Sequence, residues 1–205
     1  MTSETAPSTT EQEPQLQTPG AGLPPLENFI LKTVGFGIVG PMVSWNLSRR
    51  LFQWEGMKII QLTENLSNEQ LTRRVLIPRI TAIEDSSRYW SPAMTLAHLV
   101  IVGEAIADFV VRLSRGESIE GEVRIQDVKP DHHTLPNILD DYRAFLPRFD
   151  RTLSRDVVDQ YSPGTHPHPW VGPLTARQWL NLGAVHQRVH RKQIEKILQL
   201  GGMQP

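Results

Sequence analysis

The chain contains no cysteine among its 205 residues. Disulfide bonds and thiolate metal sites are therefore excluded, and any bound metal ion must be held by histidine and carboxylate ligands. A surplus of either charge is also lacking, because 21 Lys and Arg residues are balanced by 22 Asp and Glu residues. Such a chain lacks the basic surface with which proteins bind nucleic acid, so we expect no nucleic-acid partner.

Basic residues are absent from the first 25 positions, which are rich in Ser, Thr, Pro, Glu and Gln. A secretory signal starts with a basic region followed by an apolar core, and transit peptides are rich in Arg, so neither is indicated. We therefore expect a cytoplasmic protein. Residues 1–25 have almost nothing to bury, and because they cannot offset the entropy cost of ordering we predict a disordered tail.

The apolar stretch FILKTVGFGIVGPMV, residues 29–43, is shorter than the run of about 20 apolar residues that a membrane-spanning helix needs. It is also interrupted by Lys32, by glycines and by Pro41. We expect residues 26–44 to form an extra apolar segment that packs as a helix on the domain or on a protein partner. Association with a membrane surface is the alternative for the same segment.

Beyond this segment, apolar residues recur at helical spacing. They predict a short helix and four longer ones, at about 67–75, 43–66, 91–116, 134–153 and 175–200. Helix starts are marked by Ser91 followed by Pro92 and by the capping-box pairs Ser67–Gln70 and Thr175–Gln178. No strand pattern of any length competes. We therefore predict an all-α fold in which residues 45–205 form an up-and-down four-helix bundle.

The stretch VHQRVHRKQ, residues 185–193, places His186 and His190 four positions apart in the last predicted helix. Positions i and i+4 share a helix face, so both imidazoles can point at one site. Their nitrogens suit a divalent metal ion, zinc first, with nickel, iron or manganese as alternatives. A hydrogen-bonded pair in the core is the other interpretation, because it would also satisfy the polar atoms.

The pair continues an apolar, core-facing stripe of its helix, which also contains Trp179, Leu182, Gln193 and Ile197. A third ligand should then come from another helix, and His98 is the candidate because it lies beside the apolar stripe of the helix that starts at Ser91. Gln193 is expected to orient His190, to bind substrate or to pack in the core. No glutamate lies between the two histidines, so this is not the H-E-x-x-H motif of zinc proteases.

Four further histidines, His132, His133, His166 and His168, lie in predicted loops, where histidines are usually solvated. His168 opens the stretch HPWVGPLT directly before the last helix and could overhang the site. Glu104 and Asp108 follow His98 on one helix, and we expect them to be solvated or paired with arginine. None of these patterns assigns a catalytic residue.

Two segments carry a family resemblance. HPWVGPLTARQWLNLGAVHQRVHRKQI at 168–194 and RYWSPAMTLAHL at 88–99 resemble characteristic segments of the DinB/YfiT-like superfamily of metal-dependent enzymes. The resemblance implies a four-helix bundle over about residues 45–200. It also implies a divalent metal ion held, together with water, by His98, His186 and His190.

Family members with known activity include thiol-dependent S-transferases and hydrolase-like enzymes. The resemblance therefore predicts a metal-dependent hydrolase or S-transferase that acts on a small molecule, with a low-molecular-weight thiol as a candidate cosubstrate. A homodimer is a compatible assembly. The alternative is a non-catalytic bundle that acts on a membrane or a protein partner through residues 29–43.

Overall fold

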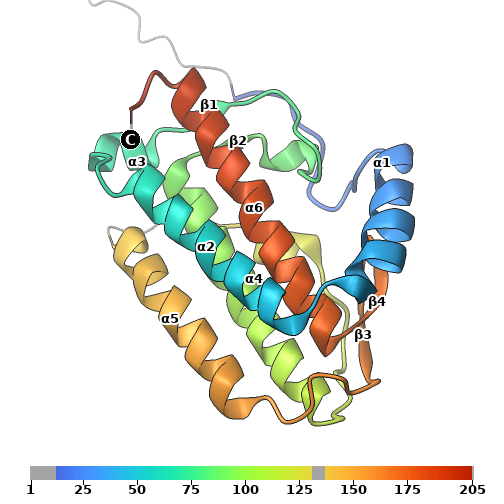
Figure 1. Ribbon diagram of the computed structural model, residues 1–205. Coiled ribbons are helices and arrows are strands. Elements are labelled where there is room, and N and C mark those ends of the chain that lie inside the picture. Colours follow the sequence, from blue (N-terminus) through green and yellow to red (C-terminus); the bar gives the residue numbers. More distant parts are fainter. Residues whose placement is uncertain (1–12, 131–136, 205) are drawn as a thin grey trace, which may run out of the picture.

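The computed structural model describes residues 13–130 and 137–204. Four of its helices, α2, α4, α5 and α6, form a bundle (Figure 1). The helices are α1 (Pro25–Ile30), a π-helical stretch (Leu31–Val39), a 3-10 turn (Gly40–Met42), α2 (Trp45–Thr63), α3 (Asn68–Thr72), a 3-10 turn (Asp85–Ser87), α4 (Pro92–Ser114), a 3-10 turn (Ile125–Val128), α5 (Ile138–Asp156) and α6 (Ala176–Leu200). The predicted all-α four-helix bundle is confirmed.

The helices of the bundle do not simply alternate in direction. In Figure 1, α2 and α6 run upward, whereas α4 and α5 both run downward. Helix α6 packs against α2 and α4, and α5 packs against α4 and α2. The order therefore differs from the simple up-and-down arrangement we expected, because residues 115–130 lead the chain back towards the end of the bundle at which α4 began.

Local capping signals set the starts of the helices. The Ser91 hydroxyl accepts a hydrogen bond from the backbone amide of Met94 at 3.1 Å, and Pro92 occupies the first turn of α4. Both predicted capping boxes are formed, at Ser67 before α3 and at Thr175 before α6. Each cap satisfies a backbone amide that has no partner within its helix.

Helix α4 is the most enclosed part of the bundle. Its Gly103 lies against the Phe145 ring of α5, and a Cβ atom added there would lie 2.2 Å from the ring. By length and composition α4 could cross a membrane, and so could residues 25–63 if the 112° bend between Met42 and Trp45 belonged to one span. In the fold, most of α4 is buried between the other helices, which accounts for its apolar composition.

Two short antiparallel hairpins accompany the helices, contrary to the expectation that no strands form. One pairs β1 (Val75–Leu76) with β2 (Tyr89–Trp90), and the other pairs β3 (Thr165–His168) with β4 (Gly172–Thr175). These strands are two or four residues long, and β3 and β4 contain proline. Strands of this length are too short to show the alternation of apolar and polar residues by which a strand is recognised in a sequence.

Residues 13–24, which belong to the predicted tail, lie along the bundle and contact it through backbone amides. The backbone amide of Gln17 donates to Asp85 at 2.8 Å, and those of Gly20 and Gly22 donate to Glu84. These carboxylates lie far along the chain from the amides that they bind, so no local sequence pattern indicates the contacts. Residues 1–12 of the predicted tail lie outside the described residues.

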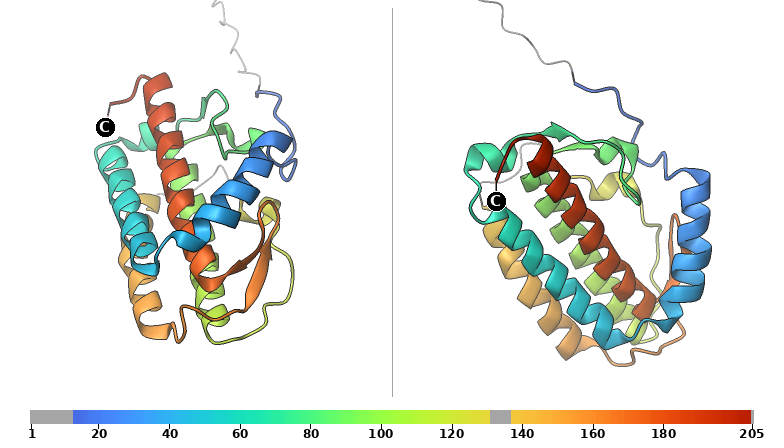
Figure 2. Two further views of the ribbon diagram at one scale, coloured as in Figure 1. Left: turned by 45° about the vertical axis from the view of Figure 1, so that its right-hand side comes forward. Right: turned by 45° about the horizontal axis from the view of Figure 1, so that its top comes forward.

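The expected apolar helix is present at residues 25–42. Beyond α1 its hydrogen bonds widen, and the amide of Gly40 donates to the carbonyl of Gly35, five residues earlier. This N-terminal helix, which comprises α1, the π-helical stretch and the 3-10 turn, stands beside the β3–β4 hairpin and the start of α6 (Figure 2). Arg177 of α6 donates to the carbonyl of Pro41 at 2.9 Å.

Candidate metal centre

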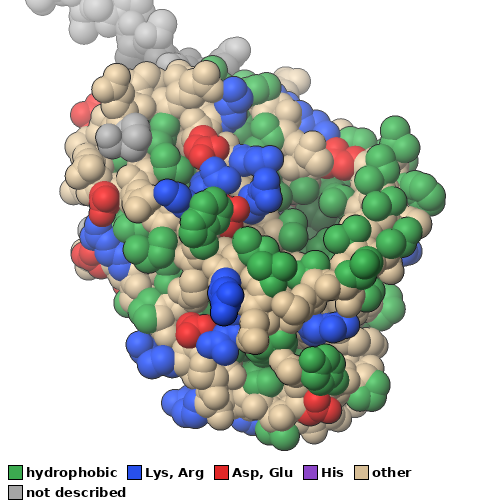
Figure 3. All heavy atoms as spheres, viewed as in Figure 1, with side chains coloured by type: hydrophobic (Ala, Val, Ile, Leu, Met, Phe, Trp, Pro, Cys, Tyr) green, Lys and Arg blue, Asp and Glu red, His purple; other side chains and the backbone are tan. Residues whose placement is uncertain are grey.

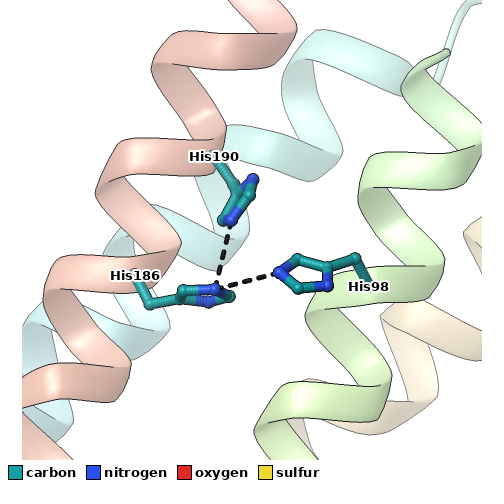
Figure 4. A group of neighbouring side chains, drawn as sticks. All are labelled: His98, His186 and His190. Carbon is teal, nitrogen blue, oxygen red and sulfur yellow. Dashed lines mark hydrogen bonds between the residues drawn. The ribbon is translucent and has the colours of Figure 1, made fainter. Parts of the chain in front are cut away.

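Three histidines from two helices converge inside the bundle. His98 is presented by α4, and His186 and His190 are presented by α6, with their rings directed at one another (Figure 4). The Nε2 atom of His186 is 3.1 Å from the Nε2 atoms of both His98 and His190. The candidate ligand atoms of all three residues lie within 4.8 Å of one another. The structure thus brings together the three residues that were predicted from the sequence.

Hydrogen bonds on the far side of two rings determine which nitrogen carries the proton. The Nδ1 atom of His98 lies 2.7 Å from the carbonyl oxygen of Val128, and that of His190 lies 2.6 Å from the Gln193 side-chain oxygen. The Gln193 amide nitrogen donates to the carbonyl of Ser87 at 2.7 Å, which fixes its orientation. Both Nδ1 atoms therefore donate, and both Nε2 atoms point a lone pair at His186.

This arrangement is incomplete without a cation. A proton on Nε2 of His186 can be donated to only one of the two facing lone pairs at a time, so at least one pair of nitrogens remains in unfavourable contact. A metal ion would satisfy all three nitrogens together. Nitrogens bound to one tetrahedral zinc ion at about 2.0–2.1 Å are about 3.3 Å apart, close to the spacing observed here. The residues therefore fit a divalent metal ion.

Burial keeps the three rings neutral at neutral pH. Removal from water lowers the pKa of His98 to about 4, an effect that its bond to Val128 opposes and that nearby Lys129 strengthens. Burial also holds the pKa of His186 and of His190 well below the usual range, and the neighbouring histidines add to the shift. Neutral imidazoles present the lone pairs that a metal ion requires.

An indole ring supports two of the histidines. The Trp90 ring is nearly parallel to that of His190, with centroids 6.1 Å apart, and meets the His98 ring edge-on at 5.1 Å. Trp90 directly precedes the Ser91 cap in RYWSP, part of a segment that carries the family resemblance. Its role as a packing support for the histidines depends on the tertiary structure.

The three histidines line one side of a cavity of about 330 Å³. Figure 3 shows a hollow on the surface with hydrophobic side chains around it. Aromatic and aliphatic side chains make up most of the cavity wall, among them Val102, Ile106, Phe109, Trp170, Trp179 and Leu182. A cavity of this size and character is typical of a small-molecule site.

His168, the loop histidine that could overhang the site by its place in the sequence, lies in the cavity lining. Its Nδ1 accepts a hydrogen bond from the backbone amide of Trp170 at 3.2 Å, so Nε2 carries the ring proton. Burial lowers the pKa of His168 to about 4 and keeps the ring neutral at neutral pH. The ring can therefore donate one hydrogen bond.

Of the three remaining histidines, the structure describes His166. His166 was expected to be solvated but is buried, because β3 turns it towards Trp179, whose indole nitrogen donates to the His166 carbonyl at 3.2 Å. His132 and His133 lie outside the described residues.

A lysine in the cavity wall had no signal in the sequence. The Lys129 ammonium lies 3.4 Å from the buried Glu84 carboxylate and 5.9 Å from the centre of the Trp90 ring. Burial lowers the pKa of Lys129, and Glu84 opposes this shift. Lys129 belongs to the connection that follows α4, and only the return of residues 115–130 along the bundle places it beside the histidines.

The carboxylates that follow His98 on α4 take no part in the centre. Glu104 pairs with Arg148 at 2.5 Å, and Asp108 lies 3.7 Å from Arg112. Both pairs are exposed, which confirms the prediction that these acids are paired with arginine.

The sequence model of the DinB superfamily matches residues 51–194. Among solved structures, the crystal structure of TT2238, a four-helix bundle protein, is 22% identical, with a TM-score of 0.48, and the match covers 74% of this chain and 98% of that chain. No curated protein matches the chain.

Proposed function

Because this chain belongs to the DinB superfamily, we propose that it is an enzyme that uses a divalent metal ion, held by three histidines, to act on a small molecule. The observation that carries the proposal is the convergence of three Nε2 atoms, two of which have their protons held on the opposite ring nitrogen. A hydrogen-bonded pair of histidines in the core would not require two lone pairs to face a third ring, because in such a pair one ring donates and the other accepts.

The ligands His98, His186 and His190 would hold the ion, with zinc first and nickel, iron or manganese as alternatives. When bound, the ion would act as a Lewis acid and lower the pKa of a water or thiol brought to it. Val128 and Gln193 keep two of the rings in the tautomer that binds. The apolar cavity excludes water from the substrate and strengthens the polar contacts made inside it.

His168 and Lys129 are polar residues of the cavity wall that are available to orient a substrate. His168 offers its Nε2 proton, and Lys129 offers a positive charge that Glu84 partly balances. A hydrolase would take water as its second reactant, whereas an S-transferase would take a low-molecular-weight thiol. We propose a reaction of one of these two types.

Metal analysis of purified full-length protein tests this proposal. We expect about one ion per chain in the wild type and almost none in His98→Ala or His186→Ala, because a site with two ligands binds far more weakly. His166→Gln is the matched control, since this buried histidine lines the same cavity but lies outside the three-histidine group. Full metal content in the two alanine variants would contradict the proposed centre.

A second candidate function is supported by the surface of the N-terminal helix. Its outward side chains are apolar and exposed, with Leu26 at 71%, Phe29 at 62%, Ile38 at 59% and Met42 at 80%. Figure 3 shows this gathering of hydrophobic side chains. Such a face is typical of a surface that meets a membrane or another protein. On this alternative, the bundle is a non-catalytic accessory protein.

The outward residues allow the alternative to be tested without disturbing the cavity. Phe29→Ser combined with Ile38→Ser should abolish cosedimentation with lipid vesicles if the face binds membranes. The same change should lower the mass measured by light scattering if the face joins two copies of the chain. Identical behaviour of wild type and variant in both measurements would exclude a role of this face in either association.

A further inference from the structure

Part of the cavity wall comes from the N-terminal helix. Leu31 and Phe36, on the π-helical turns after α1, lie in the lining of the cavity that contains the three histidines. The Phe36 side chain is 6% exposed and belongs to the same apolar core as the bundle. Both residues precede residue 51, where the match to the DinB superfamily begins. This wall is therefore a feature of the chain outside the matched region.

Carboxylates hold the start of the segment in place. The buried Glu84 accepts hydrogen bonds from the backbone amides of Gly20 and Gly22, each at 2.9 Å. Within α1, Glu27 accepts a hydrogen bond from the backbone amide of Ala82 and thereby ties the helix to the same loop of the bundle. At the far end of the helix, the bond from Arg177 to the Pro41 carbonyl completes the attachment.

The loop that receives these contacts also supports the histidines. The carbonyl of Ser87 accepts the hydrogen bond from Gln193, which in turn orients His190. Ala82, Ile83, Glu84 and Ser87 all belong to the cavity lining. The N-terminal segment, the cavity and the metal centre therefore meet at residues 82–87, and the position of the segment is defined relative to the histidines.

We propose that the N-terminal segment, residues 13–42, is a wall of the substrate site and selects substrates with an apolar carbon body. This inference rests on the proposed function, because the histidines are reached from this cavity. An apolar group placed against Leu31 and Phe36 gains by leaving water, whereas a charged group there loses its hydration without gaining a partner. The cavity volume of about 330 Å³ restricts the substrate to a compact molecule.

The same helix supplies matched controls. Leu31 and Phe36 face the cavity, whereas Val34 and Phe29 are 46% and 62% exposed on the other side. The pair Leu31→Glu and Val34→Glu introduces the same charge inside and outside the cavity. The pair Phe36→Ser and Phe29→Ser removes the same ring from each side.

The test measures binding of N-phenyl-1-naphthylamine, an uncharged apolar dye whose fluorescence rises in apolar surroundings, to the full-length protein. We expect Leu31→Glu and Phe36→Ser to raise the Kd of the dye by about tenfold or more, because a charge or hydroxyl enters the wall without a partner. Val34→Glu and Phe29→Ser should change it by less than about twofold, as is usual for surface substitutions. Circular dichroism and metal content show whether each variant keeps the bundle.

An unchanged Kd in both inward variants would overturn the proposal, since the wall would then make no contact with the ligand. An equal loss in the outward variants would also overturn it, because the dye would be bound on the exposed face. If Leu31→Glu loses helical content, the milder Leu31→Ser replaces it against Val34→Ser. Leu31→Glu and Phe36→Ser should keep the metal content of the wild type, because neither residue belongs to the three-histidine group. Loss of metal therefore reports on the metal centre, whereas loss of dye binding with the metal retained reports on the wall.

Discussion

The four-helix bundle and the N-terminal segment depend on different kinds of contact. In the bundle, α4 and α5 approach so closely that Gly103 has no space for a side chain, and hydrogen bonds behind the histidines are buried. The N-terminal segment is attached largely by carboxylates that bind backbone amides, and it has apolar side chains on both of its faces. The bundle brings the three histidines together, whereas the segment forms part of the wall of the cavity in front of them.

The largest expected difference concerns packing. Gly103→Ala should destabilise the protein by about 1–3 kcal/mol, because the new methyl group would lie 2.2 Å from a Phe145 ring that is confined by Phe52 and Phe149. Gly35→Ala on the N-terminal helix, whose added Cβ meets its nearest neighbour at 4.0 Å, should change stability by less than about 0.5 kcal/mol. Urea unfolding followed by circular dichroism measures both, and equal effects would remove the distinction between the regions.

The next difference concerns the metal ion. Gln193→Leu removes the acceptor for the Nδ1 proton of His190 and should weaken zinc binding about 10- to 100-fold. Phe36→Ala lies in the cavity wall but holds no ligand, and it should leave zinc affinity unchanged. Competition with a chromophoric chelator measures both constants. Wild-type affinity in Gln193→Leu would show that this hydrogen bond does not support the centre.

The smallest difference concerns the starts of helices. Thr175→Ala removes the cap of α6 and should cost about 1 kcal/mol of stability. Helix α1 begins after Pro24, which makes no side-chain capping bond, so Pro24→Ala should change stability by less than about 0.5 kcal/mol. Thermal unfolding compares the two variants with the wild type. A greater loss in Pro24→Ala would mean that the N-terminal helix is integral to the stability of the bundle.

Much of the bundle could be predicted because its signals are local. Ser67, Ser91 and Thr175 each cap a helix by accepting a hydrogen bond from the residue three positions further along, so the signal lies within a few residues of sequence. The spacing of His186 and His190 likewise follows from one turn of one helix. The parallel direction of α4 and α5 and the short hairpins had no comparable signal, because they depend on where a long connection and a proline-containing turn pack.

The candidate site also combines residues that were predicted from the sequence with residues that only the fold brings to it. His98 was expected as the partner of His186 and His190, first as a candidate from its place beside an apolar stripe and then from the family resemblance. Trp90 and Lys129 join the site only through the fold, since they come from a short strand and from a returning connection. The substrate, the metal and the compartment of the protein stay predictions.

The helices, their caps and a pair of histidines on one helix face follow from the amino-acid sequence, because these features depend on residues within one or two turns of each other. The tertiary structure decided the rest. It placed Nε2 of His98 3.1 Å from that of His186 across 88 residues of chain, and it brought Glu84 to the amides of Gly20 and Gly22. Contacts between distant residues arise only when the burial of apolar surface packs the helices together, and no short stretch of sequence encodes them alone.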